Sequence, residues 1–300
     1  MDALKGYNRR DNTPDFVKTV HQAPYPAIDP TKPSLSAAGK TVLITGGATG
    51  IGYSIARNFA AANASTIILL ARRASTLETA SAELSKKYPS TQVLIYAVDI
   101  SNPQAVSSTY ISATSTAKNH SIDILVLSAV YSHPQAAMLS ILDSDLRASF
   151  ETNIFGNLDL VRKFIALPSP SNHQKTILDV SSEAIFTSVP TTAGYGASKY
   201  GLTFLLRHIQ ADNPALRIHS FHPGAIWTPM VEKVGVKKSH VESLLDDEGL
   251  PGGFAVWLAG PEAEFLKGRM VFAKWDVEDL VRNRELFERD GKLATVSLKF

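Results

Sequence analysis

The chain has 300 residues, of which 44% are hydrophobic and 19% charged, and its formal net charge at pH 7 is +2. So small a charge gives no electrostatic reason to expect a nucleic-acid or membrane partner, and the absence of cysteine excludes disulfides, thiolate catalysis and thiolate metal sites, so that we expect no metal. The N-terminus is charged and has no apolar signal segment, and no apolar run reaches the roughly 18 residues of a membrane span, so a cytoplasmic protein is expected.

Residues 1–38 predict an N-terminal leader. The stretch "QAPYPAIDPTKPSLSAAG" contains four prolines and few apolar repeats. Such a composition favours a chain that lies extended over the surface of the domain that follows it. We expect residues 39–300 to form that single domain, with a substrate loop at about 225–250.

From residue 39 onward, short apolar runs alternate with segments of helical periodicity. The runs predict strands within 40–47, 65–73, 91–100, 122–130, 175–182, 216–224 and 268–275. The periodic segments predict helices within 52–63, 77–89, 103–119 and 143–167, and another that holds "YGASK" at 195–199.

Several of these strands are unbroken apolar runs, which is typical of strands that are buried on both faces. The pattern predicts an α/β protein: a doubly wound Rossmann fold, with a parallel sheet of about seven strands and helices on both faces. Ligands of such folds bind beyond the carboxyl ends of the strands.

A glycine-rich loop, "TGGATGIG" at 45–52, joins the first predicted strand to the first helix. Glycine lets the chain turn tightly and brings backbone N–H groups close to a ligand, and the helix that follows offers its positive dipole end. A pyrophosphate is therefore the expected guest. A Walker loop is excluded because no G-K-[ST] follows.

The second predicted strand ends in "LLARR", with Ala71 followed by Arg72 and Arg73. Dinucleotide folds place an acid here for a ribose 2′-hydroxyl, or an arginine for a 2′-phosphate. A guanidinium forms paired hydrogen bonds with phosphate, so the two arginines favour NADP(H) over NAD. Solvated surface arginines are the alternative. Asp99, after the third strand, would lie over the adenine ring or would instead cap the next helix.

In "YGASK", Tyr195 and Lys199 are one helical turn apart, so their side chains share a face. Taken alone, this is most often an ordinary surface pair. Three further features accompany it: Ser182 thirteen positions before the tyrosine, Asn153 in the long helix, and "PGAIWT" at 223–228.

Together, the glycine loop and these residues resemble the short-chain dehydrogenase/reductase family over roughly residues 39–275. The leader and the C-terminal "GRMVFAKWDVEDL" are most similar to fungal members, many of them in secondary metabolism. The resemblance implies the catalytic set Asn153, Ser182, Tyr195 and Lys199. It also implies that the cofactor is held by Gly46, Thr49, Gly50, Ile51, Gly52, Arg72, Arg73, Asp99, Ile100, Ser128, Tyr195, Lys199, Pro223, Ile226 and Thr228.

The chemistry of these groups suits carbonyl reduction, which needs a hydride and a proton. A free phenol has a pKa of about 10, and we expect the Lys199 ammonium to lower that pKa so that Tyr195 can donate the proton. Lys199 would also hold the nicotinamide ribose. Ser182 would hydrogen-bond the substrate oxygen, and the resemblance gives Asn153 a relay water.

Rival assignments remain for some residues. Ser181 is an alternative to Ser182, and Asn157 a weaker alternative to Asn153, which could itself merely bond a strand edge. His219 and His222 are expected in the core or at the rim, and His133 is a candidate pocket residue. Where the family usually has Asn-Asn-Ala-Gly after the fourth strand, this chain has Ser128, Ala129 and Val130, which puts the detailed nucleotide geometry in doubt.

We therefore predict an NADP-dependent oxidoreductase that acts on the carbonyl or alcohol of a small, mostly hydrophobic substrate selected by residues 225–250 and 131–135. The alternatives are reduction of an enone or imine carbon, or a non-catalytic NADPH-binding regulatory protein. Apolar residues in excess on 154–167 and 200–209, together with the family's habit of pairing these helices, predict a homodimer or homotetramer.

Overall fold

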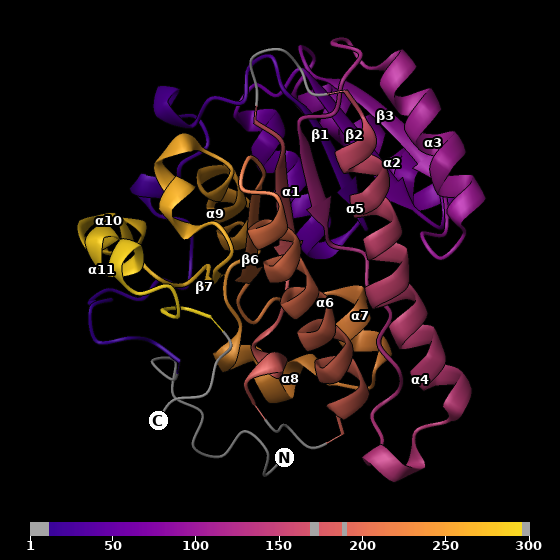
Figure 1. Ribbon diagram of the computed structural model, residues 1–300. Coiled ribbons are helices and arrows are strands. Elements are labelled where there is room, and N and C mark those ends of the chain that lie inside the picture. The colour runs from indigo at the N-terminus through magenta and orange to yellow at the C-terminus, as the bar shows by residue number, and fades with distance from the viewer. Residues whose placement is uncertain (1–11, 169–173, 188–190, 296–300) are drawn as a thin grey trace.

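The computed structural model describes residues 12–168, 174–187 and 191–295. In this part of the chain seven strands form one parallel sheet in the order β3-β2-β1-β4-β5-β6-β7 (Figure 1). The order reverses between β1 and β4, which is the position where doubly wound sheets bind their ligands. The predicted fold is confirmed.

Each predicted strand is present, although most are shorter than the apolar run that predicted them. The strands are β1 (Thr41–Thr45), β2 (Thr66–Ala71), β3 (Gln92–Ala97), β4 (Ile124–Leu127), β5 (Thr176–Val180), β6 (Arg217–His222) and β7 (Met270–Phe272). Every residue of β1, β4 and β5 is buried, because helices cover both faces of the sheet.

The helices that connect or flank the strands are α1 (Gly50–Ala61), α2 (Ala74–Lys87), α3 (Pro103–Thr116), α4 (Asp143–Phe150), α5 (Asn157–Ala166), α6 (Ala193–Asp212), α7 (Pro229–Lys233), α8 (Lys238–Val241), α9 (Leu250–Leu258), α10 (Val277–Arg282) and α11 (Arg284–Arg289). Short 3₁₀ turns complete the set: η2 (Pro26–Ile28), η3 (Pro33–Leu35), η4 (Met138–Ser140), η6 (Glu183–Ile185), η7 (Glu242–Leu244) and η8 (Pro261–Leu266).

The sheet separates two hydrophobic cores. On one face α1, α2 and α9 pack with the C-terminal helices, around residues such as Phe59 and Phe254. On the other face α3, α5 and α6 pack around residues such as Phe164 and Leu206. In Figure 1, α4, α7 and α8 gather toward the lower part of the molecule, beside the lower end of α6.

The leader differs from its prediction. From residue 12 onward it does not merely lie over a surface, because Val17 and Ile28 are fully buried in the core beneath α9 and α10. Val20 pairs with Trp275 in an isolated antiparallel bridge. The His21 imidazole stacks on the Tyr25 ring, with centroids 3.5 Å apart, and its Nε2 lies 2.6 Å from Asp276 Oδ2. Residues 12–38 of the leader are thus part of the folded domain.

The predicted long helix over 143–167 is interrupted. A π-helical turn, η5 (Glu151–Gly156), separates α4 from α5. A π turn inserts one extra residue per turn, which re-aims the side chains that follow and often marks a functional position. Here it contains Asn153. The sequence "PSPSNHQ" at 168–174, which follows this helix, lies mostly outside the described residues.

Candidate active site

The glycine loop is shaped so that side chains would obstruct it. Gly46 has φ +65°, and a Cβ there would come within 3.0 Å of the Ala129 backbone. A Cβ on Gly52 would overlap the Gly46 carbonyl oxygen. Only glycine satisfies both positions, so the backbone turns tightly in front of the N-terminus of α1. Such a cradle fits a pyrophosphate group.

This loop forms one wall of a cleft of about 500 Å³ at the carboxyl ends of the strands. Most of the residues predicted to hold the cofactor line this cleft, namely Gly46, Thr49, Gly50, Ile51, Gly52, Arg72, Arg73, Asp99, Ile100, Ser128 and Thr228. The cleft has the size and position expected of a cofactor site.

Arg72 and Arg73 are exposed residues after β2, at the edge of the cleft. Burial tends to raise the pKa of Asp99, but two hydrogen bonds from Ser101 and the charge of Arg72 lower that pKa overall. Asp99 Oδ1 accepts from the Ser101 backbone N at 3.0 Å, whereas the side chain of Asn102 caps α3. Asn102, and not Asp99, therefore caps α3.

Thr45 ties the glycine loop to the segment after β4. Its hydroxyl accepts from the backbone N–H groups of Ser128 and Ala129, each at 3.0 Å, and donates to the carbonyl of Val126. This chain thus steadies the junction of β1 and β4 without the family's usual asparagine. Ser128 and Val130 both line the cleft.

Asn153 is buried, and its side-chain amide hydrogen-bonds two other segments of the chain. Its Oδ1 accepts from the Tyr131 backbone N, and its Nδ2 donates to the Tyr131 carbonyl, both at 2.8 Å. The same Nδ2 donates to Ser198 Oγ at 2.9 Å. The amide therefore joins the π turn to the segment after β4 and to α6. Asn157, the weaker alternative, begins α5 and instead donates to the Asn153 carbonyl in the π turn.

The two candidate serines have different surroundings. Ser181 is buried, and its hydroxyl hydrogen-bonds Thr203 Oγ1 at 2.7 Å. Ser182 accepts from the Ala184 backbone N and hydrogen-bonds the Tyr195 hydroxyl. The structure thus brings Ser182, and not Ser181, to the tyrosine.

Burial raises the pKa of Tyr195, the Ser182 hydrogen bond lowers it, and the charge of Asp179 raises it again. The net direction is upward, which differs from the lowering that the sequence led us to expect. Lys199 is buried, and its ammonium donates to the Val180 carbonyl at 2.8 Å. Burial lowers the pKa of Lys199, against the attraction of Asp179. The ammonium is thus held by β5.

The loop after β6 contributes Thr228 to the cleft. Its hydroxyl caps α7 by accepting from the Val231 backbone N, and its Cγ2 would lie 3.0 Å from a Cβ on Gly50. Pro223 and Ile226, predicted in the same stretch, are buried and do not line the cleft. Tyr195 and Lys199 lie outside its lining as well.

Three histidines are placed away from the cleft lining. His219 is fully buried, and burial lowers its pKa to about 3. Burial also lowers the pKa of His222 to about 3, and its Nδ1 accepts from the Glu183 backbone N. His133 is buried and contacts the carbonyl of Pro134 through Nδ1. These placements agree with the expected core and rim roles of His219 and His222.

Sequence reasoning did not assign several residues of the cleft. Tyr131 lines it, and its hydroxyl donates to Asp145 Oδ1 at 2.5 Å. Met230, Lys233 and Val234 line it from α7 and its C-terminal end. Tyr131 and the α7 residues fall within the two stretches expected to select the substrate, but no local motif marks them individually.

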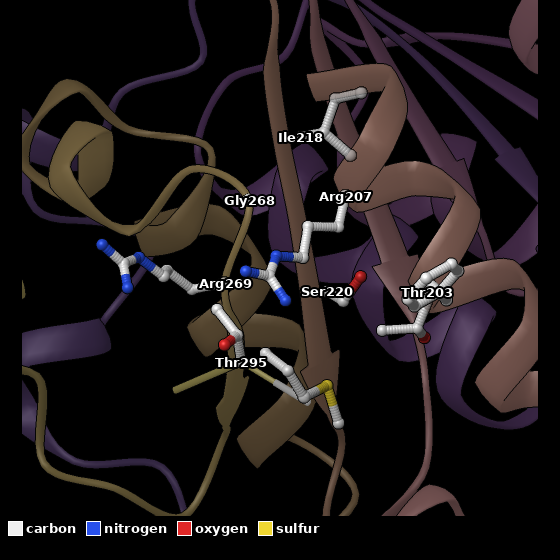
Figure 2. Close-up of a pocket in the computed structure, with 9 residues that line it drawn as sticks. Thr203, Arg207, Ile218, Ser220, Gly268, Arg269 and Thr295 are labelled. Atoms are coloured by element: carbon white, nitrogen blue, oxygen red, sulfur yellow. The ribbon is translucent and has the colours of Figure 1, made fainter. Parts of the chain in front are cut away.

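A second cavity, of about 20 Å³, lies between α6, β6 and the segment before β7 (Figure 2). Thr203, Arg207, Ser220 and Arg269 are among its lining residues. Its volume is about that of one water probe, which is too small for a substrate.

A doubly wound sheet with a glycine cradle at its switch point defines a dinucleotide-binding protein. The family model for short chain dehydrogenases matches residues 40–239, and the chain belongs to that family. It is 37% identical over 270 residues to the short chain dehydrogenase/reductase nsrO of Aspergillus novofumigatus, covering 87% of this chain and 89% of that protein. It is 36% identical to a short chain dehydrogenase/reductase of Claviceps purpurea, over 96% of each chain.

Solved structures agree with this assignment. The KRED1-Pglu enzyme superposes with a TM-score of 0.66 at 27% identity, covering 77% of this chain and 100% of the other. A 7α-hydroxysteroid dehydrogenase complexed with NADH shares the fold, with a TM-score of 0.71 at 24% identity over 84% of this chain and 97% of the other. So does Pseudomonas aeruginosa RhlG complexed with NADP, with a TM-score of 0.72 at 21% identity over 80% and 97%. The family uses nicotinamide cofactors and small-molecule substrates.

Two further findings concern the described ranges alone. No helix in them is both long and apolar enough to cross a membrane. No cluster of three or more His, Asp or Glu side chains in them could hold a metal ion.

Proposed function

We propose that this oxidoreductase reduces the carbonyl group of a small hydrophobic substrate with NADPH. The observation that carries the proposal is the hydrogen bond between Ser182 and Tyr195. Ser182 follows the carboxyl end of β5, and Tyr195 is on α6 together with the buried Lys199. Two hydroxyls that already bond each other can both bond one substrate oxygen.

Each group has a distinct role in this reaction. When bound, a nicotinamide cofactor would supply the hydride for the carbonyl carbon. Ser182 positions the carbonyl oxygen, and the Tyr195 hydroxyl donates its proton to that oxygen as negative charge develops there. By the resemblance, Lys199 would hold the nicotinamide ribose, and Asn153 would hold a relay water. The apolar side chains of Met230 and Val234 at the cleft support a hydrophobic substrate.

The preference for NADPH rests on Arg72 and Arg73. Both follow β2, where an acid would otherwise meet a ribose 2′-hydroxyl, and both line the cleft. A 2′-phosphate would accept paired hydrogen bonds from a guanidinium.

We also propose that the protein forms a homodimer or homotetramer through α5 and α6. On α6, Tyr200, Phe204 and Leu205 remain between 37% and 41% exposed, and Phe155, just before α5, is 57% exposed. Exposed aromatic residues on adjacent helices support an isologous contact. Light scattering of the purified protein measures the mass, and a mass near the chain's own 32.4 kDa would contradict the proposal.

A substrate screen tests the reaction. The purified full-length protein is incubated with small hydrophobic ketones, aldehydes, enones and cyclic imines, and consumption of NADPH is followed by absorbance. We expect ketones or aldehydes to give alcohols, with NADPH preferred over NADH by at least about tenfold. A saturated ketone from an enone, or an amine from an imine, would instead identify the alternative acceptors. Tight NADPH binding without any turnover would favour a regulatory role.

A further inference from the structure

Residues 226–245, between β6 and α9, form a loop that carries the short helices α7 and α8, and we call it the α7–α8 loop. Met230 and Lys233 line the cleft from this loop, together with residues of the glycine loop. Thr228 lies so close to the glycine loop that its Cγ2 would be 3.0 Å from a Cβ on Gly50. The position of the α7–α8 loop therefore helps to set the shape of the cleft.

Asp246 joins the two ends of the α7–α8 loop. Its backbone N–H donates to the carbonyl of Ala225 at 2.9 Å, and its carboxylate Oδ2 accepts from the Ala225 backbone N at 2.9 Å. The same Oδ2 lies against Gly224, where a Cβ would come within 2.7 Å of it. Gly224 has φ +97°, a left-handed conformation that favours glycine. The turn that precedes the loop is thus shaped around the carboxylate that follows it.

Asp246 belongs to a segment that is itself attached to the rest of the domain. The next residue, Asp247, donates its backbone N–H to the carbonyl of Gln22 in the leader at 2.7 Å. The carbonyl of Glu248 accepts from Ser54 Oγ of α1 at 2.5 Å. The carboxylate of Asp246 is therefore a fixed point, held by the leader and α1, to which the start of the loop is bonded.

The helices of the α7–α8 loop form hydrogen bonds locally. The Val231 backbone N donates to Thr228 Oγ1 at 3.3 Å, and the His240 backbone N donates to the carbonyl of Lys237 at 3.0 Å. Local bonds of this kind hold the shape of each turn, but they do not fix where the loop lies. Segments with few attachments to the domain open at a low cost in free energy. The bonds at the two ends of the loop therefore strongly affect how closely it stays on the cleft.

We propose that Asp246 is a positioning residue that holds the α7–α8 loop on the cleft, and this rests on the proposed binding of NADPH there. Its charged oxygen forms a stronger hydrogen bond with the Ala225 N–H than a neutral acceptor would. A loop that is already held in place loses less conformational entropy when a ligand binds. Loss of the carboxylate should therefore free the loop and weaken NADPH binding, and it should leave the Arg72 end of the cleft unchanged.

Limited proteolysis of Asp246→Ala measures the freedom of the loop directly. Lys233, Lys237 and Lys238 are exposed in the loop and offer sites for trypsin, whereas Lys87 is exposed at the end of α2. We expect cleavage in the loop, mapped by mass spectrometry, to become roughly tenfold faster, because it follows the population of the open loop. Cleavage after Lys87 should keep its wild-type rate. Equal acceleration at all sites would indicate general destabilisation and would overturn the proposal.

Ligand binding tests the consequence for the cofactor. In Asp246→Ala, we expect the Kd of NADPH, measured by fluorescence titration, to rise about tenfold. The fragment 2′,5′-ADP has the 2′-phosphate but no nicotinamide, and its Kd, measured by calorimetry, should stay within about twofold. Arg72 and Arg73, which the fragment should need, follow β2 and not the loop. An unchanged Kd of NADPH, or an equal weakening of both ligands, would contradict the proposal.

Asp247→Ala is the matched control. It removes the same charge one residue away, from a carboxylate that accepts from the Gly249 backbone N at 2.7 Å. We expect its loop cleavage and its Kd of NADPH to be those of the wild type. Asp246→Asn should lie closer to the wild type than Asp246→Ala, because the amide oxygen can still accept from the Ala225 N–H. If Asp247→Ala changed as much as Asp246→Ala, the effect would be one of charge alone, and the proposal would fail.

Asp246→Glu serves if Asp246→Ala does not fold. It keeps the charge, but the added methylene moves the carboxylate from its place beside Gly224 and Ala225. Loop cleavage and the Kd of NADPH should then change in the same direction by a smaller amount. Wild-type values of both would overturn the proposal.

Neither proteolysis nor ligand binding requires turnover, so the two proposals can fail separately. A protein that binds NADPH but reduces no carbonyl compound would contradict the proposed function alone. A rate of loop cleavage that is unchanged in Asp246→Ala would contradict the role of Asp246 alone.

Discussion

The nucleotide half of the site and its catalytic half hold their functional groups in different ways. In the nucleotide half, around β1–β3, the polar side chains Arg72, Arg73 and Asp99 are exposed at the cleft. In the catalytic half, around β4–β6, Asn153 and Lys199 are buried, and hydrogen bonds join them to neighbouring elements. The comparison indicates that cofactor preference can change without cost to the fold, whereas the catalytic groups also help to hold the structure together.

The largest effect should come from the catalytic half, at the proton donor. Tyr195→Phe removes one hydroxyl, so we expect kcat for carbonyl reduction to fall by roughly 10³-fold. The Kd of NADPH, measured by fluorescence titration, should stay within about twofold, because the cofactor's phosphate cradle is unchanged. Tyr200→Phe, on the exposed face of the same helix, is the matched control. A Tyr195→Phe enzyme that kept most of its activity would place the acid elsewhere.

Asn153 should link activity to stability. Asn153→Ala removes three hydrogen bonds between the π turn, the segment after β4 and α6. We expect the free energy of unfolding in urea to fall by about 3 kcal/mol, because buried partners lose their bonds. In the nucleotide half, Asn102→Ala removes the cap of α3 and should cost only about 1 kcal/mol. Equal losses in the two variants would contradict the distinction between the halves.

The smallest effect should be at Arg72, and it should be confined to affinity. Arg72→Ala is expected to raise the Kd of NADPH about tenfold, equivalent to about 1.4 kcal/mol, and to leave that of NADH and the unfolding temperature unchanged. Arg289→Ala, an exposed arginine on α11, controls for the loss of one positive charge. No change in the Kd of NADPH would remove the basis for the NADP assignment.

The same distinction explains what could be predicted from the sequence. The strands, the glycine loop and the arginine pair have local signals: an apolar run, a spacing of glycines, and two cations after a strand. The hydrogen bonds between Asn153 and Tyr131 join residues 22 positions apart, and no local sequence pattern predicts them. Asp179 is buried and accepts a hydrogen bond from Thr203 of another element, and a single acid in an apolar run gave no indication of this bond. The burial of Val17 and Ile28 was likewise missed, because prolines in a leader suggest exposure.

The docked leader also has a consequence for the order in which the molecule can be completed. His21 and Asp276 are 255 positions apart, and Val20 pairs with Trp275. Gln22 accepts a hydrogen bond from the Asp247 backbone N–H. At a synthesis rate of about 5–20 residues per second, the leader leaves the ribosome roughly 10–50 seconds before its partners. Strands β1–β6 are therefore synthesised while Val17 and Ile28 still lack these C-terminal partners.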